Sequence, residues 1–346
     1  MMKELNPEVL AIKPSGIRKF FDLVSEMKDA ISLGVGEPDF DTPWHIREEG
    51  IHSLEKGRTF YSSNAGLMEL REEISRKVES QHGVSYNAKN EVMITVGGSE
   101  AIDLAMRVMI LPGDEVLMPE PCYVSYLPCA RMAYGVPVPI PLEEKDEFRL
   151  TPEKLEAAIT EKSKLLILPF PNNPTGSIME KEDLEAIVPL ILKHNLYVLT
   201  DEIYASLSYK GKHHSIIEFP GMRERTVYIN GFSKAYAMTG WRLGYACAEE
   251  RILKQMLKLH QFAIMCAPTT SQYSAIEALR NGDADVERMR EAYDERRRFL
   301  LFHFRKMDLD CFEPYGAFYV FPSIKKFGLS STEFAERLLK EEKVAV

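Results

Sequence analysis

A lysine and an arginine share one apolar stretch of the chain, residues 228–246 (YINGFSKAYAMTGWRLGYA). Lys234 directly follows Gly-Phe-Ser, and Arg242 stands just before a second apolar run. Charged side chains are mostly exposed, so the simplest interpretation is a pair of surface charges on a loop. The chemical alternative is that an apolar pocket makes the lysine amine easier to deprotonate, while the arginine fork binds an anion. The choice depends on what other residues reach the same place.

Further polar and aromatic side chains follow the other short apolar runs of the sequence. Each has an ordinary explanation when taken alone. Gly-Gly-Ser before a helix is usually a tight turn, Asn-Pro-Thr-Gly is a turn, and an aspartate after a strand is often an N-cap. A tyrosine is more often part of a core than a platform for a ring. The set consists of Gly98, Ser99, Tyr123, Asn173, Asp201, Tyr204 and Ser233.

A repeated pattern of a short apolar run and a longer helical segment must position these residues. The runs cover residues 92–96, 115–119, 165–170, 196–200, 226–230 and 243–248. They are continuously apolar, which indicates strands buried on both faces. Segments such as 99–110 and 181–195 lie between them and have the three- and four-residue apolar spacing of helices. The alternation predicts an α/β fold, a three-layer α/β/α sandwich around a mostly parallel sheet, over residues 45–285.

The two ends of the chain have a different pattern. Residues 286–307 are typical of a long charged helix with one apolar stripe. A strand is predicted at 316–322 and a capped helix at 331–343. We expect residues 286–346 to join residues 1–44 in a smaller α+β domain.

Composition and charge exclude several classes of protein. The formal net charge of −9 argues against nucleic acid or an anionic membrane as a partner. The apolar runs are far shorter than the ~18 residues of a membrane span, and the N-terminus has no secretory signal. Five cysteines without a CxxC pair indicate free thiols, and the eight histidines lack metal-ligand spacing. We expect a cytoplasmic protein without a metal.

The residues that follow the strands form a set that fits one cofactor. Ligands of an open parallel sheet bind beyond the carboxyl ends of its strands, so these residues are expected to converge there. They offer helix-start amides and an arginine for a phosphate, an aromatic ring, a carboxylate and an amine. Pyridoxal 5′-phosphate needs each of these, because its aldehyde reacts with a lysine amine and its pyridine nitrogen pairs with a carboxylate. The sequence therefore predicts a pyridoxal-phosphate site.

The segment SKAYAMTGWRLG resembles the lysine signature of the class I/II aminotransferases, which are fold-type I pyridoxal-phosphate enzymes. The similarity covers essentially the whole chain, since PSGIRKFFDL, GEPDFDTP, YSSNAGLMELR, TVGGSEAI, NNPTG, TDEIY and GAFYVFP follow in the family's order. The match is closest to the microbial aromatic aminotransferase branch. The resemblance implies transfer of an amino group from an L-amino acid to a 2-oxo acid such as 2-oxoglutarate.

The resemblance also implies roles for individual residues. Lys234 would be the Schiff-base lysine and would carry the proton between the substrate Cα and the cofactor. Asp201 would pair with the pyridinium nitrogen. Tyr204 and Asn173 would bind the ring hydroxyl, and Asn173 would also reach the substrate carboxylate. Tyr123 would stack on the ring.

The resemblance further implies which residues contact the phosphate, the substrate and a partner subunit. The phosphate ligands would be the amides of Gly98 and Ser99, the hydroxyl of Ser233 and the guanidinium of Arg242. Tyr61 would reach the phosphate of the neighbouring subunit, which implies a homodimer. Gly36 would touch the substrate through its backbone.

The chain departs from the family pattern in two respects. Aspartate-dedicated relatives tend to carry a lysine where this chain has Ser99, so we expect aromatic or other neutral donors. The family pattern also continues beyond Val346 with an arginine that binds the substrate α-carboxylate. We expect this sequence to be C-terminally incomplete, either because the chain is truncated or because a tail of the protein is omitted from it. A protein that truly lacked the tail should still bind the cofactor, but its turnover should be severely reduced. Arg18 is a candidate replacement, although a surface charge on the N-terminal arm is the simpler interpretation.

Three alternatives stay open from the sequence. A carbon–sulfur β-lyase would use the same catalytic motifs, and an aspartate aminotransferase would differ only in its donor. A regulator that uses this fold as a ligand sensor would need a DNA-binding domain, and the sequence leaves no residues for one.

Overall fold

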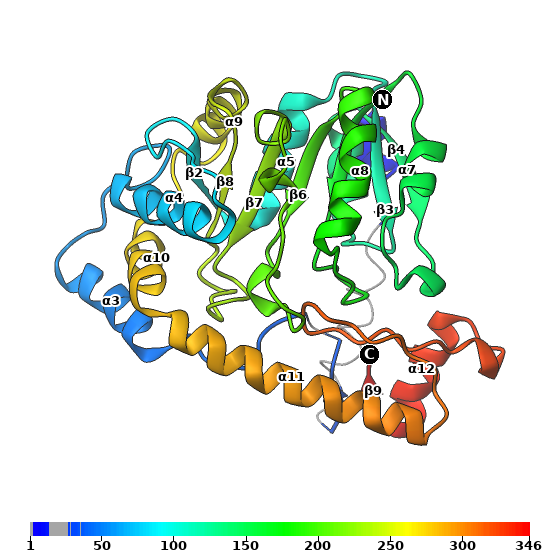
Figure 1. The fold of residues 1–346 in the computed structure, drawn as a ribbon. Coiled ribbons are helices and arrows are strands. Elements are labelled where there is room, and N and C mark those ends of the chain that lie inside the picture. The colour runs from blue at the N-terminus through cyan, green and yellow to red at the C-terminus, as the bar shows by residue number, and fades with distance from the viewer. Residues whose placement is uncertain (1–2, 14–26, 28, 35) are drawn as a thin grey trace.

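A seven-stranded sheet lies at the centre of the protein, with strand order β2-β8-β7-β6-β5-β3-β4 (Figure 1). The computed structural model describes residues 3–13, 27, 29–34 and 36–346. The strands are β2 (Val92–Thr95), β3 (Glu115–Glu120), β4 (Val136–Pro141), β5 (Ser163–Leu168), β6 (Tyr197–Asp201), β7 (Thr226–Gly231) and β8 (Gly244–Cys247). Neighbours are parallel except at β8, which is antiparallel to both β2 and β7. The predicted mostly parallel sheet is confirmed.

Helices cover both faces of this sheet (Figure 1). One face carries α5 (Gly97–Met109), α6 (Tyr126–Met132) and α9 (Glu250–Ala263). The other carries α4 (Met68–His82), α7 (Pro152–Ala158), α8 (Lys181–Lys193) and α10 (Thr269–Asn281). Successive residues of β5 point to opposite layers, because Leu165 and Ile167 belong to one buried cluster and Leu166 and Leu168 to the other. The predicted three-layer α/β/α arrangement is therefore confirmed.

Strand β4 is absent from the sequence-based prediction. Its sequence, VPVPIP, has proline at every second position: Pro137, Pro139 and Pro141. Proline cannot donate to a strand ladder and argues against a central strand. The structure resolves the conflict because β4 pairs with β3 alone and forms an edge of the sheet.

The elements outside the sandwich come from both ends of the chain. They are α1 (Pro7–Leu10), β1 (Ile31–Ser32), α3 (Trp44–Glu55), α11 (Asp283–Lys306), α12 (Ser331–Glu342) and β9 (Val344–Ala345). Short 3₁₀ helices are η1 (Glu144–Asp146), η2 (Ala205–Leu207), η3 (Ile216–Glu218), η4 (Arg223–Arg225) and η5 (Lys325–Phe327). Strands β1 and β9 pair in parallel, which joins the N-terminal to the C-terminal part. The domain boundaries at residues 45 and 285 stay a prediction.

The two predicted helices of the C-terminal part form, but the predicted strand at 316–322 is wrong. Helix α12 is capped as expected, because the Ser330 side chain and Glu333 make a reciprocal capping box. In the segment GAFYVFP, however, only Gly316 makes a strand-like bridge, with Ser208. Ala317 then has a φ of +55°, which no strand accommodates. The segment turns its aromatic side chains toward other elements instead of joining a sheet.

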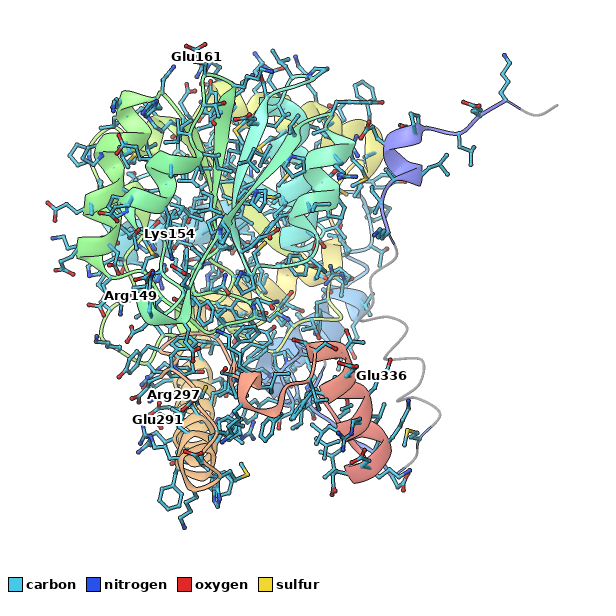
Figure 2. The ribbon with its side chains drawn as sticks, turned by 90° about the vertical axis from the view of Figure 1, so that its right-hand side faces the viewer. Arg149, Lys154, Glu161, Glu291, Arg297 and Glu336 are labelled. Carbon is cyan, nitrogen blue, oxygen red and sulfur yellow. The ribbon has the colours of Figure 1, made fainter. Side chains whose placement is uncertain are left out.

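A third buried cluster links α11 to the region beyond the sheet. It contains Met289 and Tyr293 of α11 together with Tyr204 and Ala317. Figure 2 shows α11 and α12 together below the sandwich, with Arg297 on α11. Arg297 also makes a 2.9 Å ion pair with Glu313, which holds the segment that follows α11 against the helix.

No helix in the described part of the chain combines the length and the apolar character needed to cross a bilayer.

Candidate active site

Lys234 lies just beyond the end of β7 in a half-buried position. Its Nζ donates a hydrogen bond to the carbonyl of Gly36. The same atom is 5.8 Å from the ring centroid of Tyr204 and 5.6 Å from that of Phe318. Burial lowers the pKa of Lys234 to about 8, and the nearby Arg242 charge acts in the same direction. The amine is therefore much easier to deprotonate than a solvated lysine and can act as a nucleophile or base.

Asp201 ends β6 and is buried, with an exposed fraction of 7%. Its Oδ2 accepts a 2.8 Å hydrogen bond from the hydroxyl of Tyr126, and its Oδ1 accepts one of 3.3 Å from the Ile203 amide. Burial raises the pKa of Asp201 to about 6, although these hydrogen bonds favour the ionised form. A buried carboxylate of this kind is stabilised by any cation that reaches it.

Tyr204 lies three residues beyond Asp201, and its hydroxyl is 2.6 Å from the hydroxyl of Tyr319. Burial raises the pKa of Tyr204 well above its usual value, while a hydrogen bond with Asn173 acts in the opposite direction. Both phenols therefore stay protonated at neutral pH and can donate. Gly36 packs against Tyr319 so closely that a Cβ at this position would collide with the phenol oxygen.

The start of α5 approaches Arg242 closely. Gly97 has a φ of +74°, and a Cβ there would lie 2.8 Å from Nη2 of Arg242. On the neighbouring strand, a Cβ on Gly244 would lie 2.6 Å from the backbone of both Gly97 and Gly98. Arg242 is exposed, and its Nη1 donates a 2.9 Å hydrogen bond to the Thr239 carbonyl. Because Gly97 and Gly244 have no side chains, Arg242 and β8 can lie directly against the start of α5. Helix-start amides beside a guanidinium form an arrangement that fits a phosphate.

The remaining predicted residues differ in their surroundings. Tyr123 is half-buried, and its ring meets that of Tyr126 edge to face at 5.6 Å. Ser233 is buried beside Lys234, whereas Ser99 is exposed on the first turn of α5. Tyr61 has an exposed fraction of 79%, and no hydrogen bond or ring contact joins it to the other described site residues.

Sequence reasoning missed two residues that the structure brings into this site. Tyr126 binds Asp201, and Tyr319 binds Tyr204. The only signal for Tyr126 was its place three residues after Tyr123, and Tyr319 was hidden in a segment taken for a strand. Arg18 lies outside the described residues.

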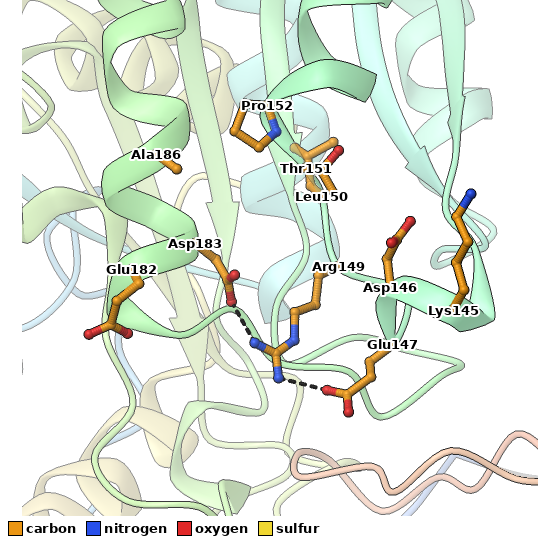
Figure 3. A pocket seen from close by; sticks show the side chains of 10 residues that line it. All are labelled: Lys145, Asp146, Glu147, Arg149, Leu150, Thr151, Pro152, Glu182, Asp183 and Ala186. Atoms are coloured by element: carbon orange, nitrogen blue, oxygen red, sulfur yellow. Dashed lines mark hydrogen bonds and ion pairs between the residues drawn. The ribbon is translucent and has the colours of Figure 1, made fainter.

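A separate hollow of about 410 Å³ lies among η1, α7 and α8 (Figure 3). Arg149 points into it and pairs with Glu147 at 2.6 Å and with Asp183 at 2.9 Å. Two lining carboxylates thus balance the charge of Arg149, and none of the predicted site residues lines this hollow.

The chain belongs to the family "Aminotransferase class I and II", whose family model matches residues 28–346. A curated relative, the "Putative aminotransferase YugH" of Bacillus subtilis, is 51% identical over 100% of this chain and 90% of its own length. The "Aspartate aminotransferase" of Pyrococcus abyssi is 46% identical over 97% of this chain and 87% of its own.

A solved structure agrees with this assignment. The aromatic aminotransferase from Pyrococcus horikoshii OT3 superposes with a TM-score of 0.91 at 43% identity, over 96% of this chain and 89% of that one. The predicted family and fold type are confirmed. The protein is a pyridoxal-phosphate-dependent aminotransferase with the fold-type I architecture.

Proposed function

We propose that Lys234 is the residue that joins the cofactor aldehyde and moves the proton of the reaction. The supporting observation is its half-buried amine, whose pKa of about 8 leaves a useful neutral fraction near physiological pH. The rings of Tyr204 and Phe318, with centroids 5.8 and 5.6 Å from Nζ, contribute to the burial of the amine. When the substrate amine replaces Lys234 on the aldehyde carbon, Nζ would become a free amine, and it could then take the proton from the substrate Cα and return it on the cofactor side.

Asp201 is proposed to hold the proton on the pyridine nitrogen. Bound pyridoxal phosphate supplies an electron-withdrawing ring that stabilises negative charge at the substrate Cα, and a protonated nitrogen strengthens this effect. The carboxylate suits the task because burial strengthens its attraction for a cation. Tyr126 fixes its orientation through Oδ2.

The ring hydroxyl and the ring face are assigned to three residues. Tyr204 and Asn173 would hydrogen-bond the hydroxyl, since the phenol already exchanges a hydrogen bond with Asn173. Tyr123 would pack on the ring face. Asn173 and the Gly36 backbone would also bind the substrate. The hydrogen bond from Lys234 to the Gly36 carbonyl supports the role of Gly36, because it places this backbone next to the reactive amine.

The phosphate is assigned to the start of α5 and its neighbours. The amides of Gly98 and Ser99 belong to the first turn, where helical amides have no partner within the helix. The close approach of Gly97 to Arg242 supports a shared anion site. Ser233 would add its hydroxyl to the same site.

Aromatic or other neutral L-amino acids are the proposed donors, with a 2-oxo acid such as 2-oxoglutarate as acceptor. The relatives named above include both an aspartate and an aromatic aminotransferase, so family membership alone leaves the donor open. Ser99 decides our choice, because a hydroxyl on the exposed first turn of α5 supplies no charge for a distal carboxylate.

A homodimer in the cytoplasm is the proposed state of the protein. Phe60, Tyr61 and Phe262 are large apolar side chains with exposed fractions of 82, 79 and 86%. Exposed apolar groups of this size favour a protein interface. Tyr61 would thereby reach the phosphate of the partner subunit. The free cysteines support a reducing compartment, and the pI of about 5.6 argues against nucleic-acid partners.

The absorption spectrum of the purified full-length protein with pyridoxal phosphate tests the proposal. We expect a visible band that is absent from Lys234→Ala, that bleaches with phenylalanine and that yields phenylpyruvate. Aspartate should act more slowly. A band that ignores every amino acid would contradict transamination by this site, and a strong preference for aspartate would overturn the donor assignment. Pyruvate and ammonia released from cystathionine would indicate a β-lyase.

A further inference from the structure

Glu100 brings a carboxylate to the first turn of α5, next to the amides of Gly98 and Ser99. Such a carboxylate is attracted to the positive end of the helix and its free amides. It would repel a phosphate and compete for the same hydrogen bonds. A phosphate site at this helix start therefore needs a device that keeps the Glu100 side chain away.

The structure contains such a device. Oε2 of Glu100 accepts a 2.5 Å hydrogen bond from the amide of Val96, the residue just before the helix. Oε1 lies 2.7 Å from Nδ1 of His260, which belongs to α9. The two contacts hold the carboxylate on the side of Val96. The amides of Gly98 and Ser99 are then left without this competitor.

The side chain of His260 has no exposed surface and makes one polar contact with the part of the chain that the structure describes. Its Nε2 is buried and has no hydrogen-bond partner among the described residues. The ring is thus satisfied at Nδ1 alone, by Glu100. An apolar side chain would fill this buried position without leaving a polar atom unpaired. The contact with Glu100 is therefore the feature that distinguishes histidine here.

We propose that His260 is a positioning residue that anchors Glu100 on Val96 and keeps the start of α5 open for the cofactor phosphate. The inference rests on the proposed phosphate role of Gly98 and Ser99. His260 acts through Glu100 and does not touch the cofactor itself.

The test compares two ligands of the cofactor-free chain, pyridoxal phosphate and pyridoxal, which share the ring and the aldehyde but differ in the phosphate. Dissociation constants for both are measured by absorption titration. In His260→Leu, the released carboxylate should weaken binding of pyridoxal phosphate by about 10- to 100-fold, the size expected for the loss of a hydrogen bond to a charged group. Binding of pyridoxal should change by less than about threefold.

Two further variants separate positioning from general damage. His260→Asn places an amide donor at the position of Nδ1. It should therefore restore most of the preference for pyridoxal phosphate over pyridoxal. In the double variant His260→Leu/Glu100→Gln the repelling charge is gone, so the affinity for pyridoxal phosphate should rise above that of His260→Leu.

His82 provides the matched control, because it is another buried histidine whose Nδ1 lies 2.7 Å from a glutamate, Glu218. His82→Leu should leave the ratio of the two dissociation constants unchanged. An unchanged ratio in His260→Leu, or the same loss in His82→Leu, would overturn the inference. If the unaltered chain fails to prefer pyridoxal phosphate over pyridoxal, the proposed phosphate site itself is wrong.

Discussion

The hydroxyl of Tyr126 donates a 2.8 Å hydrogen bond to Oδ2 of Asp201, joining α6 to the end of β6 beneath the site. Burial raises the pKa of Tyr126 well above its usual value, so the phenol stays protonated and remains a donor at neutral pH. Asp201 is thus oriented from one side, while burial raises its own pKa to about 6. The carboxylate of Asp201, held by Tyr126, is therefore a buried acceptor oriented to bind a cationic nitrogen.

Removing this donor should impair cofactor binding and catalysis together. A hydrogen bond to a charged group contributes about 1.5–3 kcal/mol, so Tyr126→Phe should lower kcat/KM by roughly 10- to 100-fold. Tyr86→Phe is the matched control, because the buried Tyr86 hydroxyl has no hydrogen-bond partner among the described residues. Equal activity of the two variants would contradict the role of Tyr126.

Two adjacent buried carboxyls should have opposite effects on the stability of the cofactor-free protein. The pKa of Asp201 is raised to about 6 by burial, so its ionised form costs stability as the pH rises from about 4 through 6. Asp201→Asn should therefore increase the free energy of unfolding at pH 7.5, by up to about 3 kcal/mol. The gain should vanish below about pH 3, where the carboxyl is protonated in both the folded and the unfolded state.

Glu202 is the comparison for Asp201. It is also buried, but hydrogen bonds from His213 and Ser215 and the attraction of His213 and His82 outweigh burial and lower its pKa. Ionised Glu202 stabilises the folded state at pH values above its unfolded-state pKa, and this stabilisation is lost as the pH falls through its lower folded-state pKa. Glu202→Gln should therefore destabilise the protein at pH 7.5. Denaturant unfolding of both variants would check the signs, and destabilisation by Asp201→Asn would contradict our view of that site.

The reactivity of Lys234 should follow its lowered pKa. In the cofactor-free protein, acylation of Lys234 should increase with pH and level off above about pH 8, where the amine is neutral. Lys145 is the control, because its hydrogen bond with Glu143 raises its pKa and its labelling should still increase at higher pH. Quantitative mass spectrometry of the two peptides gives both profiles. Parallel profiles would show that Lys234 is an ordinary solvated lysine.

The close approach of β8 to α5 should tolerate no side chain at Gly244. A Cβ there would lie 2.6 Å from the backbone of Gly97 and Gly98, so Gly244→Ala must displace the helix start. We expect a loss of about 1–3 kcal/mol in unfolding free energy and weaker binding of pyridoxal phosphate. Gly240→Ala, where a Cβ meets nothing within 4 Å, should be nearly neutral. The prediction fails if the two alanine variants have the same stability.

The central strands and most candidate site residues could be predicted because local sequence carries their signals. Continuous apolar runs mark strands covered on both faces, and the residues that follow them reach one edge by the geometry of a parallel sheet. Strand β4 was missed because its alternating prolines are tolerated only at an edge, and edge position depends on the whole sheet.

Contacts between distant segments could not be predicted from local sequence. Tyr126 and Asp201 are 75 residues apart, Tyr204 and Tyr319 are 115 apart, and Glu100 and His260 are 160 apart. No spacing rule connects such residues. The expected strand at 316–322 failed for a related reason: the left-handed turn at Ala317 sends Phe318 and Tyr319 toward Tyr204 and Tyr293.

The assignment of Lys234 is tested most directly by borohydride treatment of the full-length protein loaded with pyridoxal phosphate. Borohydride fixes a lysine–aldehyde carbon–nitrogen double bond as a stable single bond, and mass spectrometry then identifies the modified peptide. Our account predicts that the cofactor mass is found on Lys234, and that prior addition of phenylalanine abolishes the label. A label on another lysine, or none on Lys234, would contradict it.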